Sequence, residues 1–362
     1  MLYYIYMAKE YQNDLKISLD RKTNEIIKQL PDFSNKFFKY LKTKGASERT
    51  RHEYAYDLKK FFEYISLSSG FKNKSINSLP ASEILDKLTY EDIQEYFDTL
   101  NTHTIKDNKG KQKEVLSSPS TRARKISSLR SFYKFYFKIG DIKSNIADLI
   151  ELPKIPNKNI VVMDKQQVSR LLETISDTSK MDDTQKLKHS RIIKRDYAIM
   201  MLFFGTGIRV SELVGIDLED IDLYNASLLI TRKGGDEDEV YFGFEVQSAL
   251  EDYINNCRDE LLAGSKNDAL FISIQKKRMS VRSVQSMIKN YAKKAGLNMK
   301  ITPHAMRRTF GTNLYENTSD IYLVADALHH SSIETTRKHY AKMNKDHKRI
   351  AAKVSSNLFK KD

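Results

Sequence analysis

Five side chains suited to acid–base, anion-binding or nucleophilic chemistry lie within one stretch near the carboxyl end of the sequence. In order along residues 302–340 they are His304, Arg307, Arg308, His330 and Tyr340. A guanidinium donates two parallel hydrogen bonds to phosphate oxygens, and an imidazole can donate to the same oxygens. A phenol can act as a covalent nucleophile. This combination predicts chemistry on an anion.

The overall charge indicates the kind of anion. The 362 residues include 61 lysines and arginines against 47 acids, a formal net charge of +14 with a pI near 9.4. Such an excess favours a polyanionic partner, DNA or RNA. An anionic membrane surface is the competing target, but no apolar run approaches the roughly 18 residues that a spanning helix needs. No lipidation motif is present either.

Composition also bounds the compartment and the cofactors. The first residues, MLYYIYMAKEYQ, lack the basic leader and cleavage site of a secretion signal, and either Met1 or Met7 could be the start. One cysteine, Cys257, excludes an internal disulfide framework and a cysteine metal cluster. There is no Gly-rich phosphate loop and no cluster of acids. We therefore expect a cytoplasmic protein without metal or nucleotide cofactor and without a small-molecule substrate.

Length and periodicity predict a mainly α-helical protein with a small antiparallel β-sheet, divided into two domains. The first domain is predicted to contain four helices, with Ser47 and Thr89 as N-caps of the second and third. A polar loop is expected from Asn101 to Ser117, and the fourth helix from about Pro119 to Lys138. The expected boundaries are a lead-in at 1–30, a helical domain at 31–144, a linker at 145–162, a second domain at 163–343 and a terminal helix at 344–362.

Positive charge is concentrated around the fourth helix. Residues 106–138 hold ten lysines and arginines and two acids, a net of +8. A solvated helix face would explain this charge, but small hydroxyl and basic residues at a helix start are also suited to phosphate contact. We favour a DNA-facing surface, and its expected contact residues are Thr50, Arg51, Ser120, Thr121, Arg122, Arg124 and Lys125.

In the second domain, Asp164 is expected to cap a helix, and Ser176 to His189 to form a surface loop. The apolar run Asp196–Gly205 predicts a buried helix that ends at a Gly-Thr-Gly break, just before Arg209. Three antiparallel strands are predicted at 216–223, 227–231 and 240–244, with Gly234-Gly235 as a hairpin turn beside Lys233. Helices are expected at 245–263 and 281–295.

Four motifs then occur in a fixed order: GTGIRVSEL, TRKGGDEDEV, TPHAMRRTF and LHHSSIETTRKHY. Together they resemble the catalytic domain of tyrosine recombinases, the phage-integrase and Xer family, over about residues 160–350. The basic helical region before them resembles the core-site-binding domain of that family. The resemblance implies a two-domain clamp around duplex DNA that assembles as a homo-tetramer on two recombination sites, with a monomer in free solution left open.

The resemblance also implies residue roles. Arg209 and Arg307 would bind the scissile phosphate, with a further hydrogen bond from His330 and with Glu212 supporting Arg209. His304 would be the catalytic histidine of the H-x-x-R pair. Lys233 would act as general acid, and Tyr340 as the nucleophile. The sequence departs from the family at two places. The residue before the later histidine is usually Gly and is His329 here, so His329 stays an alternative to His330. The residue after the H-x-x-R arginine is often His and is Arg308 here.

The implied reaction is site-specific recombination through a 3′-phosphotyrosine and a Holliday junction. Its expected role is Xer-type resolution of chromosome or plasmid dimers. A mobile-element or prophage integrase or resolvase is the alternative. A type IB topoisomerase-like activity and a non-catalytic DNA-binding protein are the readings from other classes. Residues 337–362 carry nine lysines and arginines and two acids, a net of +7, with apolar residues at helical spacing. This tail is expected to dock on a neighbouring subunit.

Overall fold

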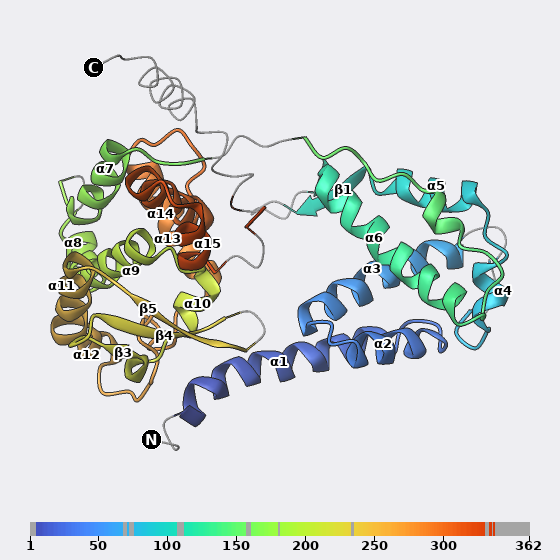
Figure 1. The fold of residues 1–362 in the computed structure, drawn as a ribbon, viewed down its shortest axis with the longest axis horizontal. Coiled ribbons are helices and arrows are strands. Elements are labelled where there is room, and N and C mark those ends of the chain that lie inside the picture. Colours follow the sequence, from blue (N-terminus) through green and yellow to red (C-terminus); the bar gives the residue numbers. More distant parts are fainter. Residues whose placement is uncertain are drawn as a thin grey trace, which may run out of the picture. The chain divides into compact units, whose positions relative to one another are not determined.

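The computed structural model describes residues 5–67, 71, 76–106, 112–156, 161–179, 182–232, 235–329, 333, 334 and 336. The chain divides into two compact units, a helical unit of Glu10–Lys158 and a second unit that includes Asn159–Asp362. Figure 1 shows the helices that dominate both of them. Within the described residues, no helix is both long and apolar enough to cross a membrane.

The helical unit consists of α-helices and one β-hairpin. Its elements are α1 (Ile5–Ile27), α2 (Ser34–Thr43), α3 (Glu48–Leu67), α4 (Ala81–Leu85), α5 (Tyr90–Thr99), β1 (Thr102–Lys106), β2 (Gln112–Leu116), α6 (Pro119–Lys138) and the 3₁₀-helix η1 (Ile146–Leu149). The core is rich in aromatic rings from α2, α3 and α6, such as Phe37 and Phe132 with ring centroids 5.1 Å apart. Edge-to-face ring packing of this kind adds stability beyond burial alone.

Helix starts in this unit follow the expected capping chemistry. The Ser47 hydroxyl accepts from the Thr50 backbone N–H at 3.2 Å, and Thr89 forms a reciprocal capping box with Asp92. Both N-cap predictions are confirmed. Helix α6 begins at Pro119, where Ser118 supplies the cap and proline stands at a position whose N–H has no helical partner.

The predicted loop from Asn101 to Ser117 is wrong. This segment contains the antiparallel hairpin β1–β2, with Thr102 opposite Leu116 and Lys106 opposite Gln112. Threonine, isoleucine and valine in THTIK and QKEVL favour extended backbone, and this preference outweighs the polar, lysine-rich composition that suggested a loop. A two-stranded sheet therefore accompanies the three-stranded one that the sequence predicted.

The lead-in segment is helical and packs against the helical unit. Asp20 on α1 accepts from Arg51 on α3 at 2.8 Å, and Thr23, which is buried, lies 3.2 Å from the His52 ring. These contacts attach the carboxyl half of α1 to α3.

The second unit consists of a small sheet and the helices that pack beside it. Its elements are α7 (Lys165–Ser176), α8 (Asp183–Ser190), α9 (Ile193–Thr206), α10 (Val210–Gly215), η2 (Leu218–Asp220), β3 (Ile221–Asp222), β4 (Ser227–Thr231), β5 (Glu237–Tyr241), α11 (Phe244–Tyr253), the π-helical turn η3 (Ile254–Arg258), α12 (Asp259–Leu262), α13 (Val281–Lys294), α14 (Pro303–Thr318) and α15 (Ile321–Ala327). The strands are antiparallel in the order β3–β4–β5. Helix α9 is the centre of the core and packs against α7, α11 and α14.

Three predictions for this unit need correction. The segment 176–189 is not a loop throughout, because α8 occupies its second half and the His189 ring, which is buried, lies 2.6 Å from the Ile175 carbonyl oxygen. The first predicted strand is reduced to Ile221–Asp222, since η2 precedes it. The third strand begins at Glu237, because it pairs residue by residue with β4 from Thr231 onward.

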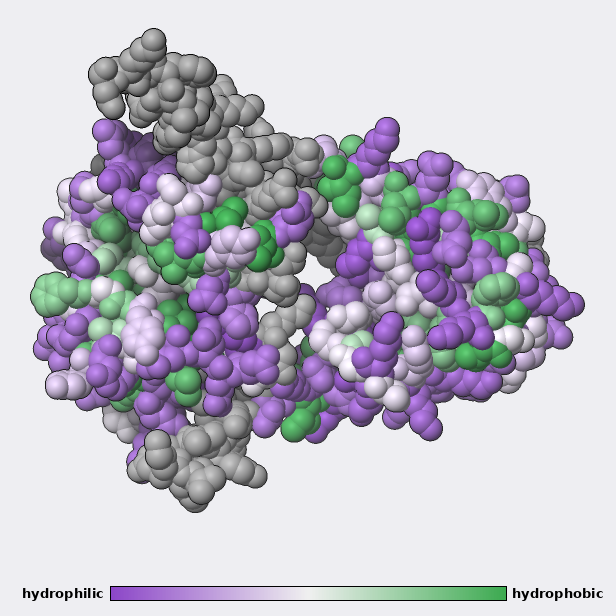
Figure 2. All heavy atoms as spheres, viewed as in Figure 1, coloured by the Kyte–Doolittle hydropathy of each residue, from purple (hydrophilic) through white to green (hydrophobic). Residues whose placement is uncertain are grey.

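The Asp164 cap is confirmed by a capping box with Gln167. Figure 2 shows hydrophilic residues across the visible face of each unit, with apolar residues in small groups between them.

Candidate active site

Arg209 is placed by the break between the buried helix α9 and helix α10. Helix α9 ends at Thr206 and is capped by Gly207, whose φ of +63° is the left-handed conformation that glycine adopts without strain. A Cβ at this position would lie 2.4 Å from a ring carbon of Phe310, so glycine is also required for packing. Arg209 then stands at the N-cap of α10 with its side chain 36% exposed. Its guanidinium therefore remains accessible to a ligand.

Glu212 holds Arg209 in this position. Its carboxylate accepts from the Arg209 backbone N–H at 2.6 Å and from Nη1 at 2.7 Å. Burial of the carboxyl raises its pKa, but the hydrogen bonds from Arg209 and the charge of Arg232 outweigh burial and hold the pKa of Glu212 below its ordinary value. Glu212 is therefore an ionised, buried anchor, as expected for a supporting acid.

Arg307 lies on α14, which Thr302 caps and Pro303 begins. Its side chain is buried, and Nη1 donates to the Gly207 carbonyl at 2.6 Å, while Nη2 donates to the Leu328 carbonyl. The neighbouring Arg308 is half-buried, and its Nε has no hydrogen-bond partner among the described residues. The structure thus brings Arg307, and not Arg308, to the segment that carries Arg209. His304 is exposed and lies one turn before Arg307 on the same helix.

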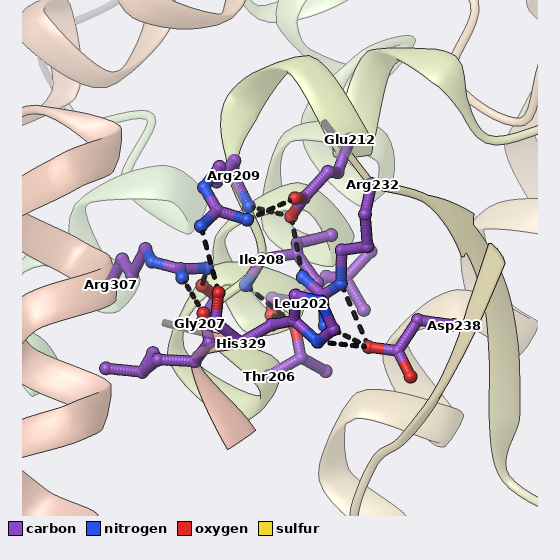
Figure 3. A network of polar contacts seen from close by, with 11 residues as sticks. Leu202, Thr206, Gly207, Ile208, Arg209, Glu212, Arg232, Asp238, Arg307 and His329 are labelled. Atoms are coloured by element: carbon purple, nitrogen blue, oxygen red, sulfur yellow. Dashed lines mark hydrogen bonds and ion pairs between the residues drawn. The ribbon is translucent and has the colours of Figure 1, made fainter. Parts of the chain in front are cut away.

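The two arginines meet at the segment that follows α15. Arg209 Nη2 donates to the His329 carbonyl at 3.4 Å, so consecutive carbonyls of Leu328 and His329 accept from Arg307 and Arg209. Figure 3 shows both guanidiniums directed toward this segment. His329 has a φ of +45°, which explains why a glycine would suit this position. His330 and Tyr340 follow, and both lie outside the described residues, as does Lys233.

Two further residues of this network were not anticipated from the sequence. Arg232 is buried and donates from Nη1 to Glu212 Oε2 at 3.1 Å and from Nε and Nη2 to Asp238 Oδ2 at 2.9 and 2.6 Å. Asp238 Oδ2 also lies 3.6 Å from His329 Nδ1. The sequence did hold a signal for the contact between Arg232 and Asp238. The acidic run DEDE follows the arginine across a tight turn, and opposite charges on paired strands attract each other.

The expected DNA-contact residues differ in how available they are. Arg51 is buried and bonded to Asp20, which supports a structural role in place of phosphate contact. Arg124 is 37% exposed but forms a double hydrogen bond with the buried Asp57 carboxylate. Arg122 donates to Asn101 at 2.6 Å.

Burial raises the pKa of the Asp57 carboxyl despite the charge of Arg124. Among the remaining expected residues, Ser120 is exposed, whereas Thr50, Thr121 and Lys125 are half-buried. Burial lowers the pKa of Lys125.

Comparison with known proteins agrees with this arrangement. Residues 161–347, more than half of the chain, match the Phage integrase family, and residues 35–139 match the Phage integrase N-terminal SAM-like domain. A tyrosine recombinase XerD from Staphylococcus haemolyticus is 31% identical over 294 residues, which cover 81% of this chain and 88% of that protein. A tyrosine recombinase XerC from Myxococcus xanthus is 31% identical over 306 residues, which cover 82% and 88%.

Solved structures show the same fold. The XerH site-specific recombinase in a post-cleavage complex with palindromic difH matches with a TM-score of 0.62 at 21% identity, covering 93% of this chain and 95% of that one. The Tn1549 transposon integrase in complex with circular intermediate DNA matches with a TM-score of 0.60 at 20% identity, covering 87% and 96%. By the family match and by the identity to curated relatives, this chain belongs to the phage integrase family of tyrosine recombinases.

Proposed function

We propose that this protein is a site-specific recombinase of the Xer type that cleaves and rejoins duplex DNA through a phosphotyrosine at Tyr340. Its substrate is a recombination site on double-stranded DNA, and its cellular role is the resolution of chromosome or plasmid dimers in the cytoplasm. The relatives named XerC and XerD, at about 31% identity over more than four-fifths of the chain, support the Xer assignment.

One observation carries the proposal. Arg209 and Arg307 come from different helices, yet they donate to the consecutive carbonyls of His329 and Leu328. Cleavage of a phosphodiester concentrates negative charge on the two non-bridging oxygens, and cations fixed in advance lower the barrier without reorganisation. Two guanidiniums locked onto one backbone segment are suited to this task.

The remaining steps follow from the chemistry of the assigned residues. The Tyr340 hydroxyl gives its proton to solvent as its oxygen attacks phosphorus, the bond to the 5′ oxygen breaks, and Lys233 gives a proton to that oxygen as general acid. His304 and His330 donate hydrogen bonds to the phosphate. The product is a 3′-phosphotyrosine and a free 5′ hydroxyl. Attack by the 5′ hydroxyl of another strand reverses the step and releases the tyrosine, so strand exchange proceeds through a Holliday junction.

The helical unit contributes DNA binding in this proposal. Its α6 region carries the net charge of +8 between residues 106 and 138, and the contact residues that we retain are Thr50, Ser120, Thr121, Arg122 and Lys125. Recombination of two sites engages four active sites, so we propose a homo-tetramer on DNA.

A nicked suicide duplex tests the proposal. Cleavage beside the nick releases a short strand, which diffuses away and leaves the covalent adduct trapped on the protein. The wild type and Tyr322→Phe should form the adduct, since Tyr322 is an exposed phenol on α15 that the reaction does not use. Tyr340→Phe should bind the duplex and form none. An adduct that persists in Tyr340→Phe would refute the nucleophile.

Two intact labelled sites and a supercoiled plasmid separate recombination from a type IB topoisomerase-like activity. A recombinase should exchange strands between two labelled sites and depend on more than one subunit. Relaxation of supercoils by a monomer at any sequence, without exchange, would favour the topoisomerase reading.

A further inference from the structure

Polar contacts in the second unit close into a ring of five residues, drawn in Figure 3: Arg209, Glu212, Arg232, Asp238 and His329. Glu212 joins Arg209 to Arg232, with Oε1 2.7 Å from Arg209 Nη1 and Oε2 3.1 Å from Arg232 Nη1. Asp238 joins Arg232 to His329, at 2.6 Å from Arg232 Nη2 and 3.6 Å from His329 Nδ1. The His329 carbonyl returns to Arg209. The ring ties together the start of α10, the β4–β5 hairpin and the segment after α15.

Arg232 is the least exposed arginine of the ring. Its side chain is 4% exposed, and the Glu212 side chain that it contacts is 3% exposed. The hydrogen bonds of a buried guanidinium must be accepted inside the protein, and truncating one partner of a buried ion pair leaves an uncompensated charge. Glu212 and Asp238 are the partners that meet this condition, one on each side of Arg232.

Arg232 also forms the base of the hairpin turn. Its backbone N–H donates to the Asp236 carbonyl at 2.7 Å, and its carbonyl accepts from the Gly235 N–H at 3.1 Å. The side chain and the backbone of Arg232 are therefore both fixed. Lys233 is the next residue along the chain, so the polypeptide leaves a fixed point directly before it. In the same way, His329 is fixed directly before His330.

We propose that Arg232 and Asp238 are positioning residues that set the general-acid lysine of the hairpin in register with Arg209 and the scissile phosphate. This inference rests on the proposed function, because it deepens the role given there to Lys233. Arg232 acts on Lys233, the next residue in the chain, and on Arg209 through Glu212. Asp238 accepts hydrogen bonds from Arg232 and so fixes its guanidinium. Neither residue is proposed to touch DNA.

A positioning role predicts a pattern of cleavage rates that a loss of fold stability would not produce. A general acid contributes about 10²- to 10⁴-fold when the leaving group needs a proton, and misplacing a reacting group by an ångström can cost about 10²-fold. When sulfur replaces the bridging 5′ oxygen, the leaving group is a thiolate. Thiols have a pKa of about 8.5, so a thiolate leaves without a proton. A defect confined to the general acid therefore disappears on the sulfur substrate, whereas a defect in folding or in the arginine clamp remains.

The experiment measures single-turnover cleavage of two suicide duplexes, one with oxygen and one with sulfur at the bridging position. Asp238→Ala is the main variant, and Asp238→Asn is the conservative one, since its amide oxygen still accepts from Arg232. Glu239→Ala is the matched control on the same strand, because Glu239 is exposed and accepts from Tyr241, outside the ring. Lys233→Ala and Tyr340→Phe report on the proposed function itself.

We expect Asp238→Ala to cleave the oxygen duplex about 10- to 100-fold more slowly than the wild type and the sulfur duplex within about threefold of it. Asp238→Asn should recover most of the loss, and Glu239→Ala should match the wild type on both duplexes. Equal slowing of Asp238→Ala on both duplexes, or no slowing on either, would overturn the positioning role. Failure of sulfur to rescue Lys233→Ala would overturn it as well, by removing the general acid. An adduct in Tyr340→Phe would instead refute the nucleophile, so the two failures are distinguishable.

Discussion

Replacement of His329 tests the backbone geometry on which both arginines depend. With a φ of +45°, His329 lies in the left-handed region, which costs an ordinary L-residue about 1–2 kcal/mol. Glycine avoids this cost but gains about 0.5–1 kcal/mol of backbone entropy in the unfolded chain. His329→Gly should therefore be more stable than His329→Ala by about 1 kcal/mol. The carbonyls of residues 328 and 329 would still accept from Arg307 and Arg209 in both variants.

The wild-type histidine should fall between the two. Its ring lies 3.6 Å from Asp238 Oδ2 with 52% of the side chain exposed, and an exposed pair of this kind contributes at most about 0.5–1 kcal/mol. His329→Ala loses this contact and keeps the strained backbone. His329→Gly also loses the contact but relieves the strain. The expected order of stability is Gly, then His, then Ala.

Calorimetric unfolding of the full-length variants measures this order. A difference of about 1 kcal/mol corresponds to about 2–4 °C in the transition of a unit of this size. The control is Leu323 in helix α15, which is 43% exposed, and there Leu323→Gly should be less stable than Leu323→Ala by about 1 kcal/mol. If His329→Ala equals or exceeds His329→Gly in stability, the left-handed conformation at residue 329 is refuted.

Three further predictions concern Gly207, Asp220 and the terminal tail. Gly207→Ala should lower stability by about 1–3 kcal/mol in thermal unfolding, since its Cβ would lie 2.4 Å from Phe310, whereas Gly296→Ala, with a similar φ and nothing within 4 Å, should cost no more than about 1 kcal/mol. Burial raises the pKa of the Asp220 carboxyl to about 6. The stabilisation that this carboxyl contributes is therefore complete below the ordinary carboxyl pKa of about 4 and is lost as pH rises through about 6. Asp220→Asn should flatten the dependence of the unfolding free energy on pH across that window, and an unchanged slope would contradict this prediction. Deletion of residues 345–362, which lie outside the described residues, should abolish strand exchange but preserve DNA binding in gel-shift assays, and unchanged recombination would rule out the docking role of the tail.

Local chemistry explains why much of the fold was predictable. Caps such as Thr89 and Asp164 need only residues three positions away, and the apolar run of α9 requires burial wherever it lies. In the third motif, the spacing of three residues from His304 likewise selected Arg307 in preference to Arg308. The predictions that failed, the loops at 101–117 and 176–189, rested on polar composition, which does not exclude a hairpin or a helix with one buried residue such as His189.

Long-range pairing explains what the sequence could not show. Arg51 and Arg124 were both predicted to contact DNA, yet their carboxylate partners lie 31 and 67 residues away at Asp20 and Asp57. Net charge over a segment does not reveal which cations are paired with carboxylates inside the fold. Long-range pairing also concealed the contact of Arg232 with Glu212 on α10, which lies 20 residues away.

Arg307 and Arg209 have different hydrogen-bond partners, and this difference suits them to different roles. Arg307 is buried, and its two Nη atoms donate to the carbonyls of Gly207 and Leu328, which attaches α14 to the end of α9 and to the segment after α15. Arg209 is 36% exposed and takes its orientation from Glu212. In the proposed mechanism Arg307 would act as a fixed charge, whereas Arg209, held by a buried carboxylate, would present its free edge to the phosphate. Because Glu212 also accepts from Arg232, it couples the orientation of Arg209 to the residue directly before Lys233. In the proposed mechanism this single carboxylate would link phosphate binding to leaving-group protonation.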